Sequence, residues 1–260
     1  MAFISKTSDF NVDEHSGLVV GVASISRDHD SGLHTHTKDQ LMFSQRGCIV
    51  ITMAGMKCVL PPMRAAWIPA GIEHSAQMTN VSHYRSLFFN ESLQPKLSRE
   101  MRILDVNPLF LALIERMAMW PFDKPEDEMI NSVNLLIEEL NAAKDTHLNL
   151  PLPHDYRLKG WLLKINNEDF LAPTLAQLST EVGASTKTIT RIFTKETGMP
   201  YQSWRQQWRL LGAIELLSKQ LRVTDIAYRL GFSSDSAFIS FFRQKTGFTP
   251  LHFIAKSTKD

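Results

Sequence analysis

The pattern of hydrophobic and polar positions changes character about half way along this chain. Between residues 17 and 90, short runs rich in β-branched and aromatic residues are separated by turn residues such as glycine, proline and aspartate. These runs cover residues 18–23, 40–44, 48–53, 65–68 and 84–89. Short strands at this spacing are typical of a sandwich or barrel. From residue 108 onward the hydrophobic period becomes helical, so the sequence predicts an all-β N-terminal part followed by helices.

The C-terminal part contains one pattern of apolar residues twice. In each copy an apolar helical stretch ends on a glycine, a serine follows, and a second helical stretch carries aromatic core positions. The copies predict two helix-turn-helix modules, at about 175–196 and 223–245. We expect Ser185 and Ser233 to cap the second helix of each module. A helix-turn-helix places its second helix in the major groove of DNA, so two modules predict contacts with two grooves.

Charge separates the two halves of the chain, although the net charge is only +1. Residues 1–157 carry 14 Lys and Arg against 19 Asp and Glu, whereas residues 158–260 carry 14 against 8. A basic C-terminal half favours binding to the phosphates of nucleic acid. This asymmetry therefore agrees with the repeated helical pattern.

The residues expected to face DNA are those left on each second helix after its apolar core positions are removed. They are Thr186, Lys187, Thr190, Arg191 and Thr194 in the first module and Asp235, Ser236, Ile239, Ser240 and Arg243 in the second. Arg191 is the best candidate for a bidentate contact to guanine, and Ile239 can meet a thymine methyl group. For each charged residue the alternative is a solvated helix face.

The two modules are joined by a predicted helix over residues 201–217, whose apolar positions follow helical spacing. At ~1.5 Å per residue this helix would be roughly 25 Å long. A rigid connection of that size can hold two second helices about one DNA turn (~34 Å) apart. We expect three further basic residues to contact phosphates, namely Arg205, Arg209 and Lys245.

A second apolar stripe lies between the strands and the modules. Met129, Val133, Leu136 and Leu140 are spaced four, three and four residues apart, which is typical of a helix pair. The helix can lie on its own barrel or can pair across a homodimer. We favour the homodimer near Met129–Leu140, because a second chain would double the DNA site and so its specificity.

These patterns together predict a multidomain protein. Its expected parts are a barrel over residues 1–100, a helical dimerisation segment over 101–147, a proline-containing linker over 148–157 and an all-α domain over 158–260. No run of 18 apolar residues occurs, so we expect no contact with membranes and a cytoplasmic location. The two cysteines, Cys48 and Cys58, fit neither a zinc pattern nor a disulfide framework.

The C-terminal hundred residues resemble the paired helix-turn-helix domain of the arabinose-regulator (AraC/XylS) transcription factors. The resemblance rests on Ile226-Ala227, on the stretch 230–234, on Phe238, on Phe241-Phe242-Arg243 and above all on Lys245-Thr-Gly-Phe-Thr-Pro250. It implies sequence-specific binding of double-stranded DNA by both second helices. The positions that it implies for base reading are Lys187, Thr190, Arg191, Asp235, Ser236 and Ile239.

The N-terminal part resembles the cupin barrels. His34-Thr-His36, Gln40 and Gly47 have the spacing of the first cupin motif, and Pro69-Ala-Gly-Ile-Glu-His74 has that of the second. In metal-dependent cupins the positions matching His34, His36 and His74 bind the metal, with a glutamate where this chain has Gln40. The resemblance therefore implies a cupin-like barrel that senses an effector.

Three uses of these histidines remain open. They can bind a divalent ion such as Zn, Ni or Fe, line a metal-free pocket for a small molecule, or stabilise the barrel. The missing carboxylate weakens the case for oxygenase chemistry. We expect the pocket to contain His34, His36, Gln40 and His74, with Arg64 and Trp67 shaping it.

The expected function is a one-component transcription regulator whose barrel responds to a small molecule or a metal. RNA polymerase is an expected partner, and likeness to cupin-bearing family members suggests a neighbouring efflux-transporter gene as target. One alternative is a cupin-type metal-dependent enzyme that carries a DNA-targeting domain, and another is a nucleoid-like binder without a sensor. We expect no catalytic residue and no enzymatic activity.

Overall fold

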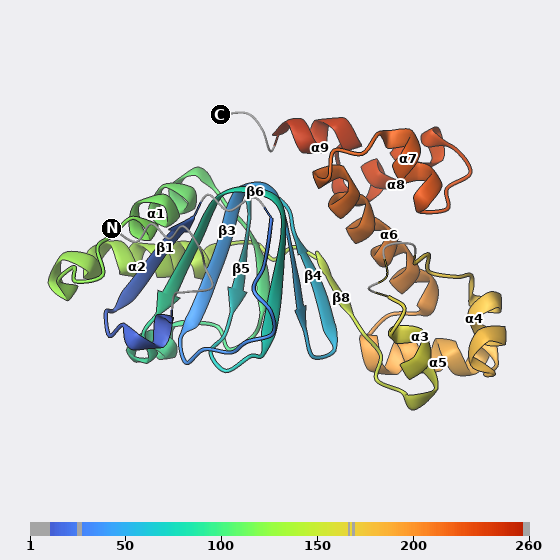
Figure 1. The fold of residues 1–260 in the computed structure, drawn as a ribbon, viewed down its shortest axis with the longest axis horizontal. Coiled ribbons are helices and arrows are strands. Elements are labelled where there is room, and N and C mark those ends of the chain that lie inside the picture. The colour runs from blue at the N-terminus through green and yellow to red at the C-terminus, as the bar shows by residue number, and fades with distance from the viewer. Residues whose placement is uncertain (1–10, 25–27, 166, 168–169, 257–260) are drawn as a thin grey trace. The chain divides into compact units, whose positions relative to one another are not determined.

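The chain divides into two compact units (Figure 1), a sheet unit and a helical unit. The computed structural model describes residues 11–24, 28–165, 167 and 170–256. Of these residues, 11–24, 28–53 and 59–148 form the sheet unit, and 54–58, 149–165, 167 and 170–256 form the helical unit. Among the described residues, no helix has the length and apolar character that crossing a membrane requires.

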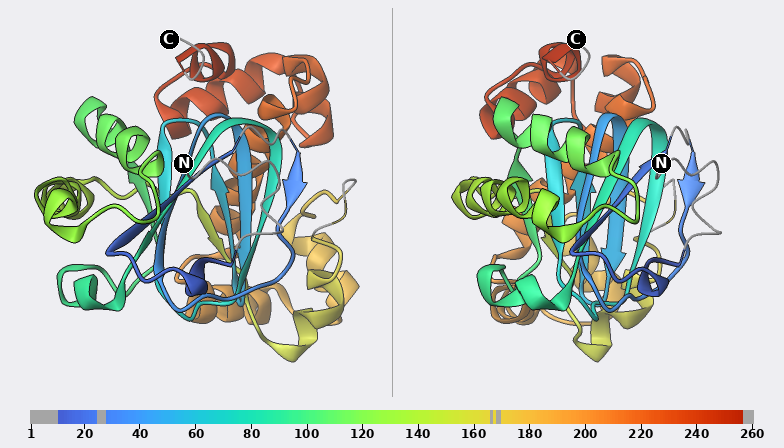
Figure 2. Two further views of the ribbon diagram at one scale, coloured as in Figure 1. Left: turned by 60° about the vertical axis from the view of Figure 1, so that its left-hand side comes forward. Right: turned by 90° about the vertical axis from the view of Figure 1, so that its left-hand side faces the viewer.

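One antiparallel sheet of eight strands organises the N-terminal half, which confirms its predicted all-β character (Figure 2). β3 and β6 pair along most of their length, β1 and β2 pair with β6, and β4 and β5 pair with β3. The strands are β1 (Val19–Ser24), β2 (His29–Asp30), β3 (Asp39–Met53), β4 (Met56–Leu60), β5 (Arg64–Ile68), β6 (His74–Phe89), β7 (Arg102–Asp105) and β8 (Asn149–Pro151).

The structure joins two of the predicted strands into one. The predicted runs 40–44 and 48–53 are both parts of β3, with an irregularity in pairing between Arg46 and Cys48. Gly47 sits at this bulge with φ +84°, and a Cβ there would lie 2.5 Å from the backbone of Asn80. Glycine lets the strand bulge and continue, where the sequence predicted a turn.

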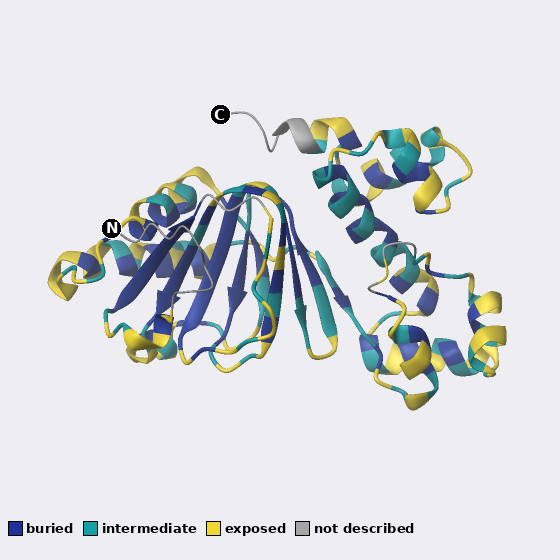
Figure 3. Cartoon of the chain, in the orientation of Figure 1, coloured by how far each residue is buried: buried dark blue, intermediate teal, exposed yellow. Residues whose placement is uncertain are grey.

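Two helices cover one face of this sheet, α1 (Pro108–Ala118) and α2 (Glu126–Ala142). Side chains that alternate along the strands pack against them, and Figure 3 shows most of the strand positions as buried. The core beneath the helices includes Leu41, Phe43, Trp67, Leu87 and Phe89.

The apolar stripe of α2 belongs to this core, so its assignment to a dimer seam was wrong. Met129, Val133, Leu136 and Leu140 are fully buried within the sheet unit. A side chain that already packs on its own sheet has no surface left for a second chain. Ile130 and Leu135, each 37% exposed, are the large apolar side chains that α2 turns outward.

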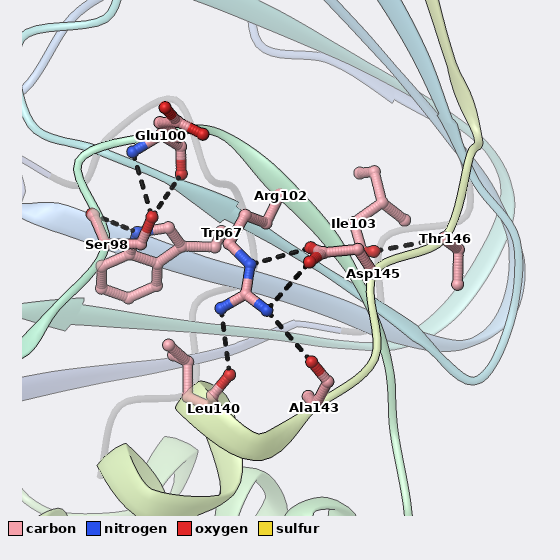
Figure 4. Close-up of polar contacts among 9 residues, drawn as sticks. All are labelled: Trp67, Ser98, Glu100, Arg102, Ile103, Leu140, Ala143, Asp145 and Thr146. Atoms are coloured by element: carbon pink, nitrogen blue, oxygen red, sulfur yellow. Dashed lines mark hydrogen bonds and ion pairs between the residues drawn. The ribbon is translucent and has the colours of Figure 1, made fainter.

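Arg102 on β7 fastens the C-terminal end of α2 to the sheet (Figure 4). Its guanidinium donates to the carbonyl oxygens of Leu140 at 3.3 Å and Ala143 at 3.0 Å. It also pairs with Asp145, with Nε 2.8 Å from Oδ1. The last carbonyls of a helix lack partners within the helix, and Arg102 supplies a charged donor to two carbonyls at this end.

Replacing Arg102 with Met is expected to lower the free energy of unfolding of the sheet unit by about 1–3 kcal/mol, because partly buried carbonyls lose a charged donor. Urea unfolding of the full chain, followed by a probe in the sheet unit, measures the change. Arg99→Met is the matched control, since Arg99 is exposed and its one hydrogen bond within the described part of the chain is to Gln94. Equal effects of the two variants would contradict the proposed role of Arg102.

The helical unit consists of short helices arranged around α6, as predicted. α6 packs against α5, α7 and α9 and also against β8. The helices are α3 (Lys159–Leu162), α4 (Leu175–Val182), α5 (Thr186–Thr197), α6 (Tyr201–Ser218), α7 (Val223–Arg229), α8 (Asp235–Thr246) and α9 (Pro250–Lys256).

The stretch predicted as a linker is more ordered than expected. Residues 149–151 form β8, which pairs antiparallel with β4, and residues 156–158 form a 3₁₀ turn. The side chain of Trp204 donates to the carbonyl oxygen of Pro151 at 2.7 Å. Pro151 therefore lies in a short strand with defined partners.

Candidate nucleic-acid interface and candidate effector pocket

The first helix pair is built by local capping. Thr174 and Gln177 form a capping box at the start of α4, and α4 ends at Gly183 in the left-handed region with φ +65°. The Ser185 side chain then caps α5 by accepting from the backbone N–H of Thr188, as predicted. The caps fix both ends of the turn, so the start of α5 is held rigidly.

The outer face of α5 carries the polar residues that the sequence singled out. Its inner residues Ile189, Ile192 and Phe193 are buried in the helical unit. The outer face borders a groove lined by Leu175, Thr186, Lys187, Thr190, Arg191, Thr194 and Lys195. Within the described chain, no hydrogen bond or ion pair engages the charged ends of Lys187 and Arg191. These two side chains stand one helical turn apart and are free to meet a ligand.

The second helix pair has a turn that is one residue longer. Gly231 adopts φ +68° after α7, and Ser234 caps α8 by accepting from the backbone N–H of Ala237. The prediction of Ser233 as the cap was therefore wrong. The sequence repeat itself contains the reason, since the extra residue between Gly231 and the helix moves the cap by one position.

α8 turns a comparable set of side chains outward. Ser236, Ser240 and Arg243 are exposed, while Asp235 and Ile239 are half-buried. The Asp235 carboxylate accepts from the hydroxyl of Thr224 at 2.9 Å, so it ties α8 to the start of α7. This bond gives Asp235 a structural contact that the sequence did not predict.

One of the three predicted phosphate contacts is contradicted. Arg209 is buried, its Nη2 donates to the carbonyl oxygen of Gly231 at 3.0 Å, and its guanidinium stacks on Phe232. It faces inward because it satisfies the turn of the second module. Arg205 is half-buried and donates to the carbonyl oxygen of Ala172 at 2.8 Å, whereas Lys245 is exposed.

A pocket of about 360 Å³ opens on the face of the sheet opposite α1 and α2. Its walls come from β1, β2, β3 and β6, from residues 11–13 and from the loop before β3. The apolar part of the lining includes Val22, Met42, Met78 and Phe88, and the polar part includes His34, His36, Gln40 and Ser86.

The three predicted histidines form one cluster beside this pocket, which His34 and His36 line and His74 does not. His34 and His74 are joined by two backbone hydrogen bonds of 2.9 Å, and their ring centres lie 4.4 Å apart. The ring of His36 lies 5.2 Å from that of His74. One nitrogen from each of the three rings lies within 4.8 Å of the other two. The spacing of the two sequence motifs therefore brings the imidazoles into one cluster.

Burial keeps two of these imidazoles neutral. Desolvation lowers the pKa of His74 to about 4, even though the Ile72 carbonyl opposes the shift. It also lowers the pKa of His36, against the effect of hydrogen bonds to Gln40 and Lys38. Neutral imidazole is the form that binds metal ions, so the cluster suits a divalent ion chemically.

Gln40 lies beside this cluster and is itself held in place. Its Oε1 is 3.1 Å from Nε2 of His36, and its Nε2 donates to the hydroxyl of Ser86 at 2.8 Å. Within the cluster an amide therefore takes the place of a carboxylate.

Three of the residues expected at the pocket do not line it, namely His74, Arg64 and Trp67. Trp67 pairs with Leu41 in the sheet and shares its buried face under the helices, opposite to Gln40. Arg64 forms an ion pair with Asp105, with Nε 2.8 Å from Oδ1. Side chains alternate between the two faces of a strand. Trp67 pairs directly with Leu41, so its side chain lies on the same face of the sheet as that of Leu41 and on the opposite face from Gln40.

Sequence reasoning missed the contribution of β6 to the pocket. Tyr84, Ser86 and Phe88 line it at every second position. Their neighbours Leu87 and Phe89 lie in the core under the helices. The alternation was visible in the sequence, but nothing in the sequence said which face was hollow.

Known proteins resemble this chain along most of its length. A family model described as a helix-turn-helix domain matches residues 178–256. The HTH-type transcriptional regulator NimR of Escherichia coli (strain K12) is 30% identical over 88% of this chain and 84% of its own length. The virulence regulon transcriptional activator VirF of Yersinia enterocolitica is 26% identical over 94% of this chain and 91% of its own. A crystal structure of ToxT from Vibrio cholerae O395 covers 93% of this chain and 97% of its own, at 11% identity and a TM-score of 0.39.

Proposed function

We propose that this chain, which belongs to the AraC family of helix-turn-helix transcriptional regulators, reads DNA with α5 and α8 together. Family membership establishes a DNA-binding regulator of transcription. The proposal adds the residues that read the bases and the control exerted by the sheet unit.

Base reading by α5 and α8 is supported by the polar side that each of these helices turns outward. α5 and α8 each bury an apolar side in the helical unit and turn a polar side outward, with Arg191 on one and Arg243 on the other. Neither outward side is covered within the described part of the chain. An uncovered basic face on a capped helix has the form that enters a major groove.

The connection between the modules supports simultaneous reading. α6 has 18 residues and packs against helices of both modules. A helix of this length spans ~27 Å, which is close to one turn of duplex, ~34 Å. We therefore propose that α5 and α8 enter consecutive major grooves on one side of the DNA. The proposed reading residues are Thr186, Lys187, Thr190, Arg191, Thr194, Asp235, Ser236, Ile239, Ser240 and Arg243.

Replacing Arg191 with Ala is expected to cost about 1–3 kcal/mol of binding to the target site and to relax the preference at one base pair. Titration of a set of single-base variants of the target DNA with the full chain measures both effects. Lys159→Ala, an exposed substitution on α3, is the control. An equal loss on every sequence would show that Arg191 contacts a phosphate.

Control by the sheet unit is the second part of the proposal. The pocket has both apolar and polar lining residues and has the size of a site for a small ligand. We propose that its occupant, a small molecule or a metal ion, changes how tightly the chain binds DNA. The expected observation is a shift in DNA affinity of the full chain when the pocket is filled, and no shift in a variant with a blocked pocket.

Further partners follow from a regulator of this kind. We propose that the chain acts in the cytoplasm, where it meets DNA and RNA polymerase, that it controls a neighbouring efflux-type gene, and that it forms a homodimer. Any dimer contact on α2 has to use outward residues such as Ile130 and Leu135, because its inner stripe is occupied.

A further inference from the structure

The surroundings of the histidine cluster beside the pocket determine which ring nitrogen each residue offers. Nδ1 of His34, His36 and His74 lies 3.0, 2.6 and 2.9 Å from the carbonyl oxygens of Gly32, Lys38 and Ile72, respectively. A carbonyl oxygen only accepts, so each Nδ1 carries the hydrogen of a neutral ring. Each Nε2 is left with a free lone pair. This arrangement, in which a backbone carbonyl orients the ring from behind, is the usual support of a metal-binding histidine.

One of these lone pairs is not used by any residue that the structure describes. His74 is fully buried, and its Nε2 has no hydrogen-bond partner among those residues. Leaving a buried acceptor unsatisfied costs about 1–3 kcal/mol. A bound cation would satisfy it.

Gln40 supplies a fourth donor atom. Its amide nitrogen is anchored on the Ser86 hydroxyl, which leaves Oε1 3.1 Å from Nε2 of His36. With the hydrogen of His36 on Nδ1, two lone pairs face each other across this distance. An ion bound by both atoms resolves the conflict. A half-turn of the Gln40 amide, which exchanges its oxygen and nitrogen, would also resolve the conflict. Titration with a metal ion distinguishes this arrangement from a bound ion.

We propose that the histidine cluster beside the pocket binds one divalent transition-metal ion through Nε2 of His34, His36 and His74 and Oε1 of Gln40. We further propose that this ion is an exchangeable effector of DNA binding. The inference deepens the proposed function, since it rests on control by the sheet unit and names the occupant. Imidazole-rich sets suit ions such as Zn²⁺, Co²⁺ and Ni²⁺, whereas Mg²⁺ and Ca²⁺ prefer oxygen ligands.

All four ligands are uncharged, so the residues that contact the ion do not compensate its two positive charges. This makes the ion exchangeable. Two carboxylates line the same pocket but have other partners. Asp13 accepts from the N–H and the hydroxyl of Thr37, and Asp30 accepts from the N–H of Gly32. A neutral set holds an ion less tightly than one containing a carboxylate, as a reversible sensor requires.

Binding requires only a small movement of side chains. The histidine nitrogens lie within 4.8 Å of one another, whereas bonds of ~2.0–2.1 Å would bring them roughly 3.3 Å apart. His36 and His74 are buried and fixed, but His34 is only half-buried. Rotation of the His34 ring is the movement expected on binding.

Titration of the metal-free full chain with Co²⁺, followed by visible absorption, tests the proposal. We expect one ion per chain, displaced by Zn²⁺. His74→Ala should weaken binding by about tenfold or more, and Gln40→Glu should strengthen it by about tenfold, because a carboxylate adds a negative charge. His83→Asn, at an exposed position outside the pocket with φ +54°, should bind as the unmodified chain does. Circular dichroism confirms the fold of each variant.

Specific results would overturn the proposal. It fails if Co²⁺ does not bind, if His74→Ala binds as tightly as His83→Asn, or if Gln40→Glu leaves the affinity unchanged. It also fails if the ion binds but alters the DNA affinity of the full chain by less than about twofold. Because DNA binding is measured in metal-free buffer as well, intact binding there would leave the proposed function standing. Failure of the unmodified chain to bind its target DNA both in metal-free buffer and with the ion present would instead contradict that function.

Discussion

Trp204→Ala is expected to destabilise the helical unit by about 3–5 kcal/mol and to abolish DNA binding. Trp204 is fully buried on α6 and packs its ring against Trp161, Phe193 and Tyr201, with centroid distances of 5.5, 5.3 and 6.0 Å. Its indole N–H also donates to the carbonyl oxygen of Pro151. Because α5 is seated on this cluster, removal of the indole leaves a cavity beneath the first reading helix.

Urea unfolding of the full chain, followed by circular dichroism, measures this change, and a DNA titration measures its consequence. Trp208→Ala is the matched control, because Trp208 is only half-buried and meets Phe170 at the edge of the cluster. We expect the control to lose clearly less stability. A loss below about 1 kcal/mol for Trp204→Ala would show that the cluster does not support the unit.

Gly21→Ala is expected to have a comparably large effect on the sheet unit, about 3 kcal/mol or more. Gly21 lies in β1, where α1 ends against the strand. A Cβ at this position would lie 2.7 Å from Cα of Ala118 and nearer still to the carbonyl oxygen of Met117. Both obstacles are backbone atoms, so no side-chain rotation relieves the clash, and α1 has to move away from the sheet.

The control for this substitution is Gly17→Ala, where the nearest atoms to a new Cβ are 3.7 Å away. Thermal unfolding of the two variants should differ strongly, with Gly17→Ala close to the unmodified chain. If Gly21→Ala unfolds at the same temperature as Gly17→Ala, α1 does not pack on β1 as described.

The repeated helix pairs could be predicted from the sequence because their signals are local. A glycine at the end of the first helix and a serine before the second determine where each helix stops and starts. Even the misplaced cap at Ser233 follows a local rule, since the longer turn of the second module moves the cap to Ser234.

The packing of α2 could not be predicted in the same way. A stripe at Met129, Val133, Leu136 and Leu140 has the same appearance whether it meets a sheet or another helix. Periodicity shows that one side of a helix is covered but not what covers it. Only the tertiary structure places this stripe on the sheet.

The residues at the pocket could be predicted only in part. The histidine motifs gave three ring positions, and the structure brings those rings together. The wrong placement of Trp67 came from nearness along the chain, which says nothing about the face of a strand. Arg209 shows the same limit, since a basic residue on a helix is equally compatible with a phosphate and with the buried carbonyl of Gly231.

The most direct test of the central claim is a hydroxyl-radical and methylation footprint of the full chain on the DNA flanking its own gene. Two helices reading together predict two protected major-groove segments, about one helical turn apart on the same side of the duplex. Arg191→Ala should weaken one segment and Arg243→Ala the other. A single protected segment that responds to both substitutions, or protection without any preferred sequence, would contradict the account.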